Sequence, residues 1–145
     1  MIAGRSREEG SALMLVPAAV LVLLVLGAIC VDSAVVFLAQ RDLANRTAAT
    51  ANDIAGSAVS DSAFYGERGL LFLDDRRASA FARLAFSADQ VPGGYESWAG
   101  DATTDGAHVR VEATARVRSI FAKAIPGAPD STEVHARSEA TIRQS

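Results

Sequence analysis

The two histidines, His108 and His135, are the side chains best suited to carry protons near neutral pH. Each falls on the polar side of a segment in which apolar and polar residues alternate, next to arginine and glutamate. A catalytic histidine needs an orienting acid and a nucleophile in a cleft, and a metal site needs more ligands than these two. We therefore expect exposed strand histidines in a chain that is not an enzyme and has no catalytic residues, no metal site and no cofactor.

Two pairs of acids have positions that indicate structural roles. Asp74 and Asp75 precede a segment of helical periodicity, where acids cap a helix and favour its first turn. Asp105 is followed by Gly106, a pair typical of a two-residue hairpin turn, and Asp101 lies in the segment before it. These acids predict a helix start and a turn rather than general acid and base catalysis.

The single cysteine, Cys30, lies within an apolar stretch and can form no disulfide within the chain. Lipid modification is one alternative, but Ile29 occupies the position where bacterial lipoproteins carry glycine or alanine. The other interpretation is a small hydrophobic side chain. In either case the folded domain must be held together by packing.

Residues 11–31 form a run of twenty-one residues without a charged side chain. A hydrocarbon core of about 30 Å requires about 20 apolar residues, whereas the apolar part of a signal peptide has about 7 to 15. Arg5 and Arg7 lie closer to this run than Arg41 and Arg46 on its other side, which favours a cytoplasmic N-terminus. We therefore expect a single-pass protein of the cell membrane, divided into a cytoplasmic tail (1–10), a transmembrane segment (11–39), a helical extension (40–60) and an extracytoplasmic α+β domain (61–145).

Asp32 is the acid embedded in this apolar region, between Val31 and Val35. A carboxylate at the bilayer centre is costly, and such residues usually have a partner or a function. One hypothesis is that Asp32 pairs with a cationic group on a partner helix. The other is that Asp32 lies in the headgroup region and marks the end of the span.

Residues 40–60 contain no proline and continue the helical pattern beyond the span. Small residues recur there at helical spacing, in a stripe of Ala44, Ala48, Ala51, Ala55 and Ala58. Such a stripe permits close backbone approach, so together with Asp32 it is a candidate helix-association face. The alternative is that the stripe packs on the protein's own sheet, as an amphipathic helix ordinarily does.

The remaining sequence predicts a small domain of class α+β. A second, shorter helix is expected after Asp75, with an apolar face of Ala78, Phe81, Leu84 and Ala85. Alternation predicts strands at residues 108–118 and 133–143, and the hairpin turn implies a partner strand within 95–104. The expected fold is a long N-terminal helix, a second short helix and an antiparallel sheet of about three strands.

Residues 119–131 connect the last two strands and contain Ile120, Phe121 and Ile125. We expect this excursion to cover the open end of the sheet, with contact to the membrane surface as the alternative. If the sheet domain binds a ligand or partner, the candidate contacts are Tyr95, Trp98 and Phe121.

Residues 8–60 carry a recognisable order of features. A charged tail ends in Gly10, the span contains Leu15, Val16 and Pro17 and ends at Asp32, and residues 40–45 are followed by alanine repeats. This pattern resembles the TadE/TadG-like membrane proteins of Flp-type, or tight-adherence, pilus assembly, and the strand-rich tail is similar to that of actinobacterial members. Family members that a prepilin peptidase cuts often carry glutamate at the fifth position after the glycine, whereas this chain has Leu15 there.

The resemblance implies a pilin-like, non-catalytic accessory or minor component of a Flp/Tad-type pilus or secretion apparatus. Its implied partners are the membrane, other membrane proteins of that apparatus, and further copies in a homo- or hetero-oligomer. The alternative is a membrane-tethered module whose extracytoplasmic sheet domain binds a ligand. The net charge of -3 comes from interspersed acids and bases, which argues against nucleic acid as a partner.

Overall fold

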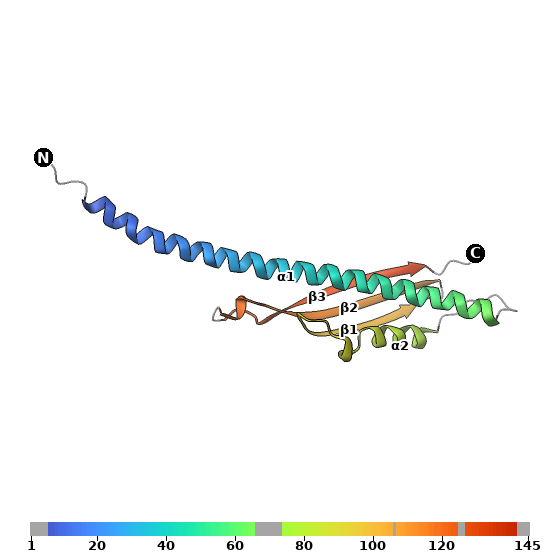
Figure 1. The fold of residues 1–145 in the computed structure, drawn as a ribbon. Coiled ribbons are helices and arrows are strands. Elements are labelled where there is room, and N and C mark those ends of the chain that lie inside the picture. Colours follow the sequence, from blue (N-terminus) through green and yellow to red (C-terminus); the bar gives the residue numbers. More distant parts are fainter. Residues whose placement is uncertain (1–5, 66–73, 106, 125–126, 142–145) are drawn as a thin grey trace.

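The computed structural model describes residues 6–65, 74–105, 107–124 and 127–141. Helix α1 (Ser6–Tyr65) is a continuous helix of 60 residues that includes Pro17. Its C-terminal half lies along a three-stranded sheet, and its N-terminal half projects beyond the sheet (Figure 1). The predicted α+β class, with a long N-terminal helix and a small antiparallel sheet, is confirmed.

The sheet consists of β1 (Tyr95–Thr104), β2 (His108–Arg118) and β3 (Ser131–Thr141), antiparallel and in chain order. The alternation predicted the bounds of β2 correctly, and β1 occupies the range, 95–104, within which its partner strand was expected. Strand β3 begins two residues before its predicted start, and residues 142 and 143 lie outside the described ranges. The sheet is therefore the arrangement that the period of two predicts.

The predicted two-residue turn between β1 and β2 is wrong. Thr104 pairs with Val109, so the connection is longer, and Gly106 lies outside the described residues. The Asp105 carboxylate accepts hydrogen bonds from the backbone N–H groups of Ala107, at 3.0 Å, and His108, at 2.7 Å. The Asp105 carboxylate thus takes the place that a backbone carbonyl would have in a tighter turn, as acceptor for the N–H groups of Ala107 and His108.

Helix α2 (Asp75–Ala85) begins after Asp74, whose carboxylate accepts a hydrogen bond from the backbone N–H of Arg76 at 3.2 Å. This cap confirms the helix start that the acids predict. The predicted apolar face of α2 needs correction, because its buried residues are Ala78 and Ala82. The larger side chains predicted to face inward, Phe81 and Leu84, are exposed.

One hydrophobic core joins both helices to the sheet. Helix α1 packs mainly on β2 and β3, whereas α2 packs on β1. Every second residue of β2 is buried in this core, and the set comprises Val109, Val111, Ala113, Ala115 and Val117. Leu43 and Ile54 of α1 are buried in the same cluster, so the helical extension and the sheet share one core.

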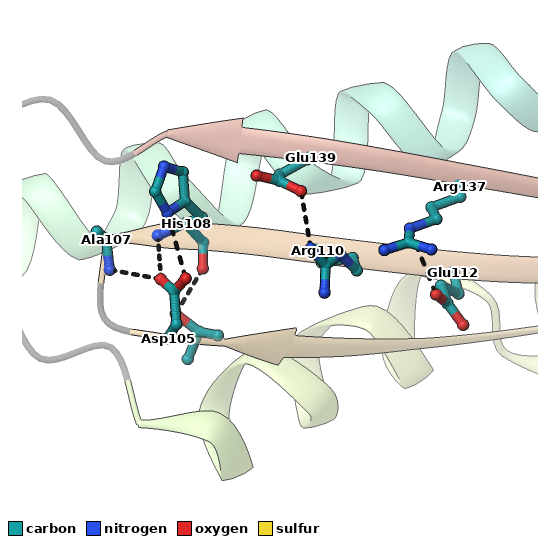
Figure 2. Close-up of polar contacts among 8 residues, drawn as sticks. Asp105, Ala107, His108, Arg110, Glu112, Arg137 and Glu139 are labelled. Atoms are coloured by element: carbon teal, nitrogen blue, oxygen red, sulfur yellow. Dashed lines mark hydrogen bonds and ion pairs between the residues drawn. The ribbon is translucent and has the colours of Figure 1, made fainter.

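The opposite face of the sheet is polar, and both helices lie behind the strands when this face is viewed (Figure 2). Arg110 of β2 pairs with Glu139 of β3 at 3.1 Å, and Glu112 pairs with Arg137 at 3.5 Å. These side chains are roughly half exposed or more, so each pair contributes little to stability. The arrangement explains why the alternation of charged and apolar residues in this part of the sequence is so regular.

Candidate functional site

The N-terminal half of α1 carries most of the exposed large apolar side chains in the described part of the chain. The helix is long and apolar enough to cross a membrane, and its most apolar eighteen-residue window contains no buried residue. Large apolar side chains such as Leu23 and Leu24 are exposed, each at 68%. Such exposure is typical of a helix surrounded by lipid or by other helices, since no described residue of the sheet domain covers these side chains.

The alanine stripe divides between the core and the surface. Ala51 and Ala55 are buried, Ala48 is half-buried and Ala44 is exposed, whereas the side chain of Ala58 lies outside the described residues. The buried face of α1 also includes Leu43, Thr47, Thr50 and Ile54. Hence the inner part of the stripe packs on the protein's own sheet, which is the alternative that the sequence left open.

Small residues on the projecting half of α1 have a different environment. Gly27 and Ala34 are exposed, and a Cβ atom at Gly27 would meet no atom within 4 Å. They lie seven residues apart and thus on one side of the helix, two turns from each other. This side is available for close packing against another helix in a way that Ala51 and Ala55 are not.

The Asp32 carboxylate binds the segment between β2 and β3. Its Oδ1 accepts hydrogen bonds from the backbone N–H groups of Ile120, at 2.8 Å, and Phe121, at 3.1 Å. Its Oδ2 accepts from Ala122 at 2.7 Å and from Phe121 at 3.2 Å. The pairing of Asp32 with a cation on a partner helix stays a prediction, and within this chain the carboxylate already has three donors.

The same segment contains two half-exposed apolar side chains, Ile120 at 47% and Phe121 at 44%. It also contains the short 3-10 helix η2 (Ala122–Ala124). Residues 119–124 lie past the end of β2, beside α1 (Figure 1). Residues 120–122 are bound to the helix through Asp32, and Ile120 and Phe121 are exposed and do not join the core cluster, so these two side chains do not form the expected cover of the sheet. Ile125 lies outside the described residues.

Tyr95, one of the predicted ligand contacts, joins the sheet to α1. Its hydroxyl lies 2.9 Å from the carbonyl oxygen of Ala39 and 3.1 Å from Oδ2 of Asp42, and it can donate to either acceptor. Burial, reinforced by the negative charge of Asp42 and the hydrogen bond to it, raises the pKa of Tyr95 to about 12. The hydroxyl of Tyr95 therefore joins β1 to α1 within the fold.

Trp98, the second predicted contact, is 7% exposed and belongs to the core. Its indole N–H donates to the carbonyl oxygen of Ser87 at 2.8 Å, and its ring meets Phe86 edge to face at 5.4 Å. The guanidinium of Arg46, on α1, lies 5.4 Å from the centre of the indole ring. Trp98 therefore links α1, β1 and the end of α2, and of the three predicted contacts Phe121 alone keeps a substantial free surface.

Sequence reasoning missed the residues of α1 that receive these aromatic side chains. Asp42 and Arg46 form an ion pair at 2.9 Å, one helical turn apart. Their four-residue spacing is a visible signal for a pair on one helix face. Nothing in the sequence indicated that Tyr95 and Trp98 would lie against that pair.

The histidines lie where the alternation placed them. His135 is exposed and lies 3.4 Å from Glu133, and His108 is half-buried beside Asp105 at 3.3 Å. In the described ranges no group of three or more histidine, cysteine, aspartate or glutamate side chains is arranged to hold a metal ion. Cys30 is exposed on the apolar half of α1.

Comparisons with protein-family models, with curated proteins and with solved structures found no match to this chain. Its function must therefore be argued from the two halves of α1 and from the domain that one of them carries.

Proposed function

We propose that this protein is a non-catalytic, pilin-like accessory or minor component of a Flp/Tad-type pilus or secretion apparatus. In this proposal the helix crosses the cell membrane with its N-terminus in the cytoplasm, and the sheet domain lies outside. The resemblance to TadE/TadG-like proteins supplies the biological setting.

The observation that carries the proposal is the contrast between the two halves of α1. The C-terminal half buries Leu43, Ala51 and Ile54 against its own sheet, whereas the apolar N-terminal half is exposed. A simple tether needs only hydrophobic bulk, but Gly27 and Ala34 add a surface suited to a neighbouring helix. We therefore assign assembly with other membrane subunits to this half of the helix rather than to the alanine stripe further along.

The alternative, a tethered ligand-binding module, receives less support from the side chains expected to bind. Trp98 is buried, and the Tyr95 hydroxyl is hydrogen-bonded to α1. Three surface hollows on the strands, α2 and the turn after β1 are open and are lined mostly by charged or polar residues. None has the enclosed, apolar form typical of small-molecule sites.

The test replaces the two small residues by larger apolar ones, Gly27→Leu together with Ala34→Leu. This variant keeps the anchor hydrophobic but blocks close approach of a second helix. The matched control is Val22→Leu with Ile29→Leu, which changes two exposed apolar residues at the same spacing on another side of α1. Membrane insertion is checked for both by resistance to alkaline extraction.

Support for the proposal requires that the Gly27/Ala34 variant stays inserted but loses pili, or secretion through the apparatus, in the native host. The control variant should retain both. Normal pili and normal secretion with the Gly27/Ala34 variant would contradict assembly through this half of the helix.

A further inference from the structure

We propose that residues 119–124, which follow β2, form a second membrane contact, in which Ile120 and Phe121 enter the lipid surface where α1 leaves the bilayer. This inference requires that α1 lies in a membrane. It does not require that the protein belongs to a pilus.

The first step is the fixed position of this segment beside α1. The Asp32 carboxylate holds three consecutive backbone N–H groups, those of Ile120, Phe121 and Ala122, at 2.7 to 3.2 Å. Charge-assisted hydrogen bonds of this kind are stronger than those between neutral groups. The tip of the sheet domain is therefore attached to the helix at the level of Asp32.

The second step is the depth of Asp32 relative to a bilayer. Residues 11–31 contain no charge, and at 1.5 Å per residue they span about 30 Å, which is the thickness of the hydrocarbon core. When this run fills the core, Asp32 lies at its outer boundary. The segment bound to Asp32 then lies at the same boundary.

The third step is the kind of surface that the segment presents there. Ile120 and Phe121 are each close to half exposed, and Lys123 follows them with an exposed side chain. Apolar side chains next to a lysine suit the interface, where the ring and aliphatic groups enter the acyl boundary and the ammonium group reaches the headgroups. The backbone donors that would be costly in lipid are already bound to Asp32.

Helix α1 continues this apolar surface. Phe37 is 65% exposed and lines the same shallow hollow as Asp32, Ser119 and Ala122. It lies five residues beyond Asp32, about 8 Å along the axis, and so within the headgroup layer where aromatic side chains gather. Continuity with the apolar half of α1 is the reason to name lipid as the occupant. The exposed Phe81 and Leu84 of α2 have no such connection to the span.

A domain attached at two points has a fixed orientation on the membrane. If the helix were the only membrane contact, α1 and the sheet could rotate together about the helix axis and could tilt. With Ile120 and Phe121 in the lipid surface, the end of the sheet nearest η2 faces the bilayer and the β1–β2 turn points away from it. This orientation would set which face of the domain is presented to other subunits.

The test is depth measurement by spin labelling of the full chain in vesicles of phosphatidylethanolamine and phosphatidylglycerol. The background is Cys30→Ala, which removes the only native thiol. Labels are placed one at a time at Ile120→Cys and Phe121→Cys, with Leu24→Cys as the reference within the span and Ala107→Cys as the aqueous reference at the opposite turn. Trp98 fluorescence confirms that each labelled variant is folded.

The expected result is that labels at 120 and 121 collide more often with dissolved oxygen than with a water-soluble nickel chelate, as the label at 24 does. The label at 107 should show the reverse. Labels at 120 and 121 that behave like the label at 107 would overturn the proposal. Protection of 120 and 121 from both reagents would also overturn it, because the occupant would then be protein, such as a second copy of this chain.

Discussion

The carboxylate of Asp32 accepts hydrogen bonds from the backbone N–H of Phe121, which lies 89 residues later in the chain. This contact joins the apolar half of α1 to the tip of the sheet domain. It gives an acid at the edge of the predicted span an intramolecular role that the sequence did not indicate. It also makes Asp32 a residue whose replacement has a local, measurable consequence.

We predict that Asp32→Leu loosens the segment it binds without unfolding the sheet. The N–H groups of Ile120, Phe121 and Ala122 lose their acceptor, so their amide hydrogen exchange should become faster, while amides within β2 keep their protection. Exchange followed by mass spectrometry in detergent or vesicles measures this. Ser33→Leu is the control, since it adds an apolar side chain at the next position and keeps the carboxylate. Equal exchange at residues 120–122 in both variants would contradict the role given to Asp32.

We predict that Tyr95 ionises at much higher pH than an ordinary tyrosine. The chain has two tyrosines, so the ultraviolet titration of the wild type minus that of Tyr95→Phe isolates Tyr95. Because burial and Asp42 raise its pKa to about 12, the difference curve should have its midpoint well above the ordinary value of 10.0. A midpoint at the ordinary value would mean that the phenol does not lie against Asp42.

The same shift predicts how stability depends on alkaline pH. The unfolded chain loses the Tyr95 proton near the ordinary pKa, whereas the folded chain keeps it until about pH 12. The contribution of Tyr95 is thus present below pH 10 and is lost as the pH rises through 12. The melting temperature of the wild type should therefore fall more steeply between pH 10 and pH 12 than that of Tyr95→Phe. If the melting temperatures of the two proteins fell in parallel with pH, the prediction would be wrong.

We predict that Gly100→Ala destabilises the domain. An added Cβ atom would lie 2.2 to 2.9 Å from ring atoms of Phe86, so the ring that packs on Trp98 must move. Overpacking of this kind costs about 1–3 kcal/mol in the free energy of unfolding. Gly56→Ala is the matched control, because a Cβ atom there meets nothing within 4 Å and alanine favours a helix by about 0.5–1 kcal/mol. In unfolding followed by Trp98 fluorescence, Gly100→Ala should be less stable than the wild type and Gly56→Ala should be more stable.

We predict that the turn between β1 and β2 contributes to acid sensitivity. Hydrogen bonds from the backbone N–H groups of His108 and Ala107 lower the pKa of Asp105 (Figure 2). A lowered pKa stabilises the fold above the ordinary value of 3.8, and this contribution is lost as the pH falls through the folded-state pKa. The melting temperature of Asp105→Asn should therefore fall less between pH 5 and pH 2 than that of the wild type.

The Ser79 hydroxyl and the Arg83 guanidinium, both on α2, donate hydrogen bonds to Asp101 on β1. These hydrogen bonds lower the pKa of Asp101. Asp101→Asn should therefore also reduce the loss of stability in acid. If neither Asp101→Asn nor Asp105→Asn alters the acid side of the melting curve, other carboxylates control it.

The regular elements could be predicted because each has a simple period. Alternation from His108 to Arg118 places every second residue in the core, and the acids at Asp74 and Asp75 start α2. The side of α1 that faces the sheet was harder to predict, since the buried residues Leu43, Thr47 and Ile54 share that side with only part of the alanine stripe. Which of two adjacent helical stripes is buried depends on the shape of the sheet, which the local sequence does not contain.

The candidate contacts could not be predicted because they depend on tertiary position. Tyr95 and Trp98 are ordinary candidates for a binding surface until Ala39, Asp42 and Arg46 are placed beside them. Asp32 is similar, because its partners are backbone groups and carry no sequence signal. Of the three predicted contacts, Phe121 is the one whose side chain stays largely exposed and is free to contact lipid or another molecule.

Assembly through the apolar half of α1 can be tested by crosslinking in the native host from a photoreactive residue at Ala34, compared with one at Ala51. Ala34 is exposed on the apolar half of α1, whereas Ala51 is buried against the sheet. We predict that position 34 captures identified membrane subunits of a pilus or secretion apparatus, and that position 51 gives only links within the chain. Lipid adducts alone at position 34 would contradict assembly through this helix and leave α1 as a tether.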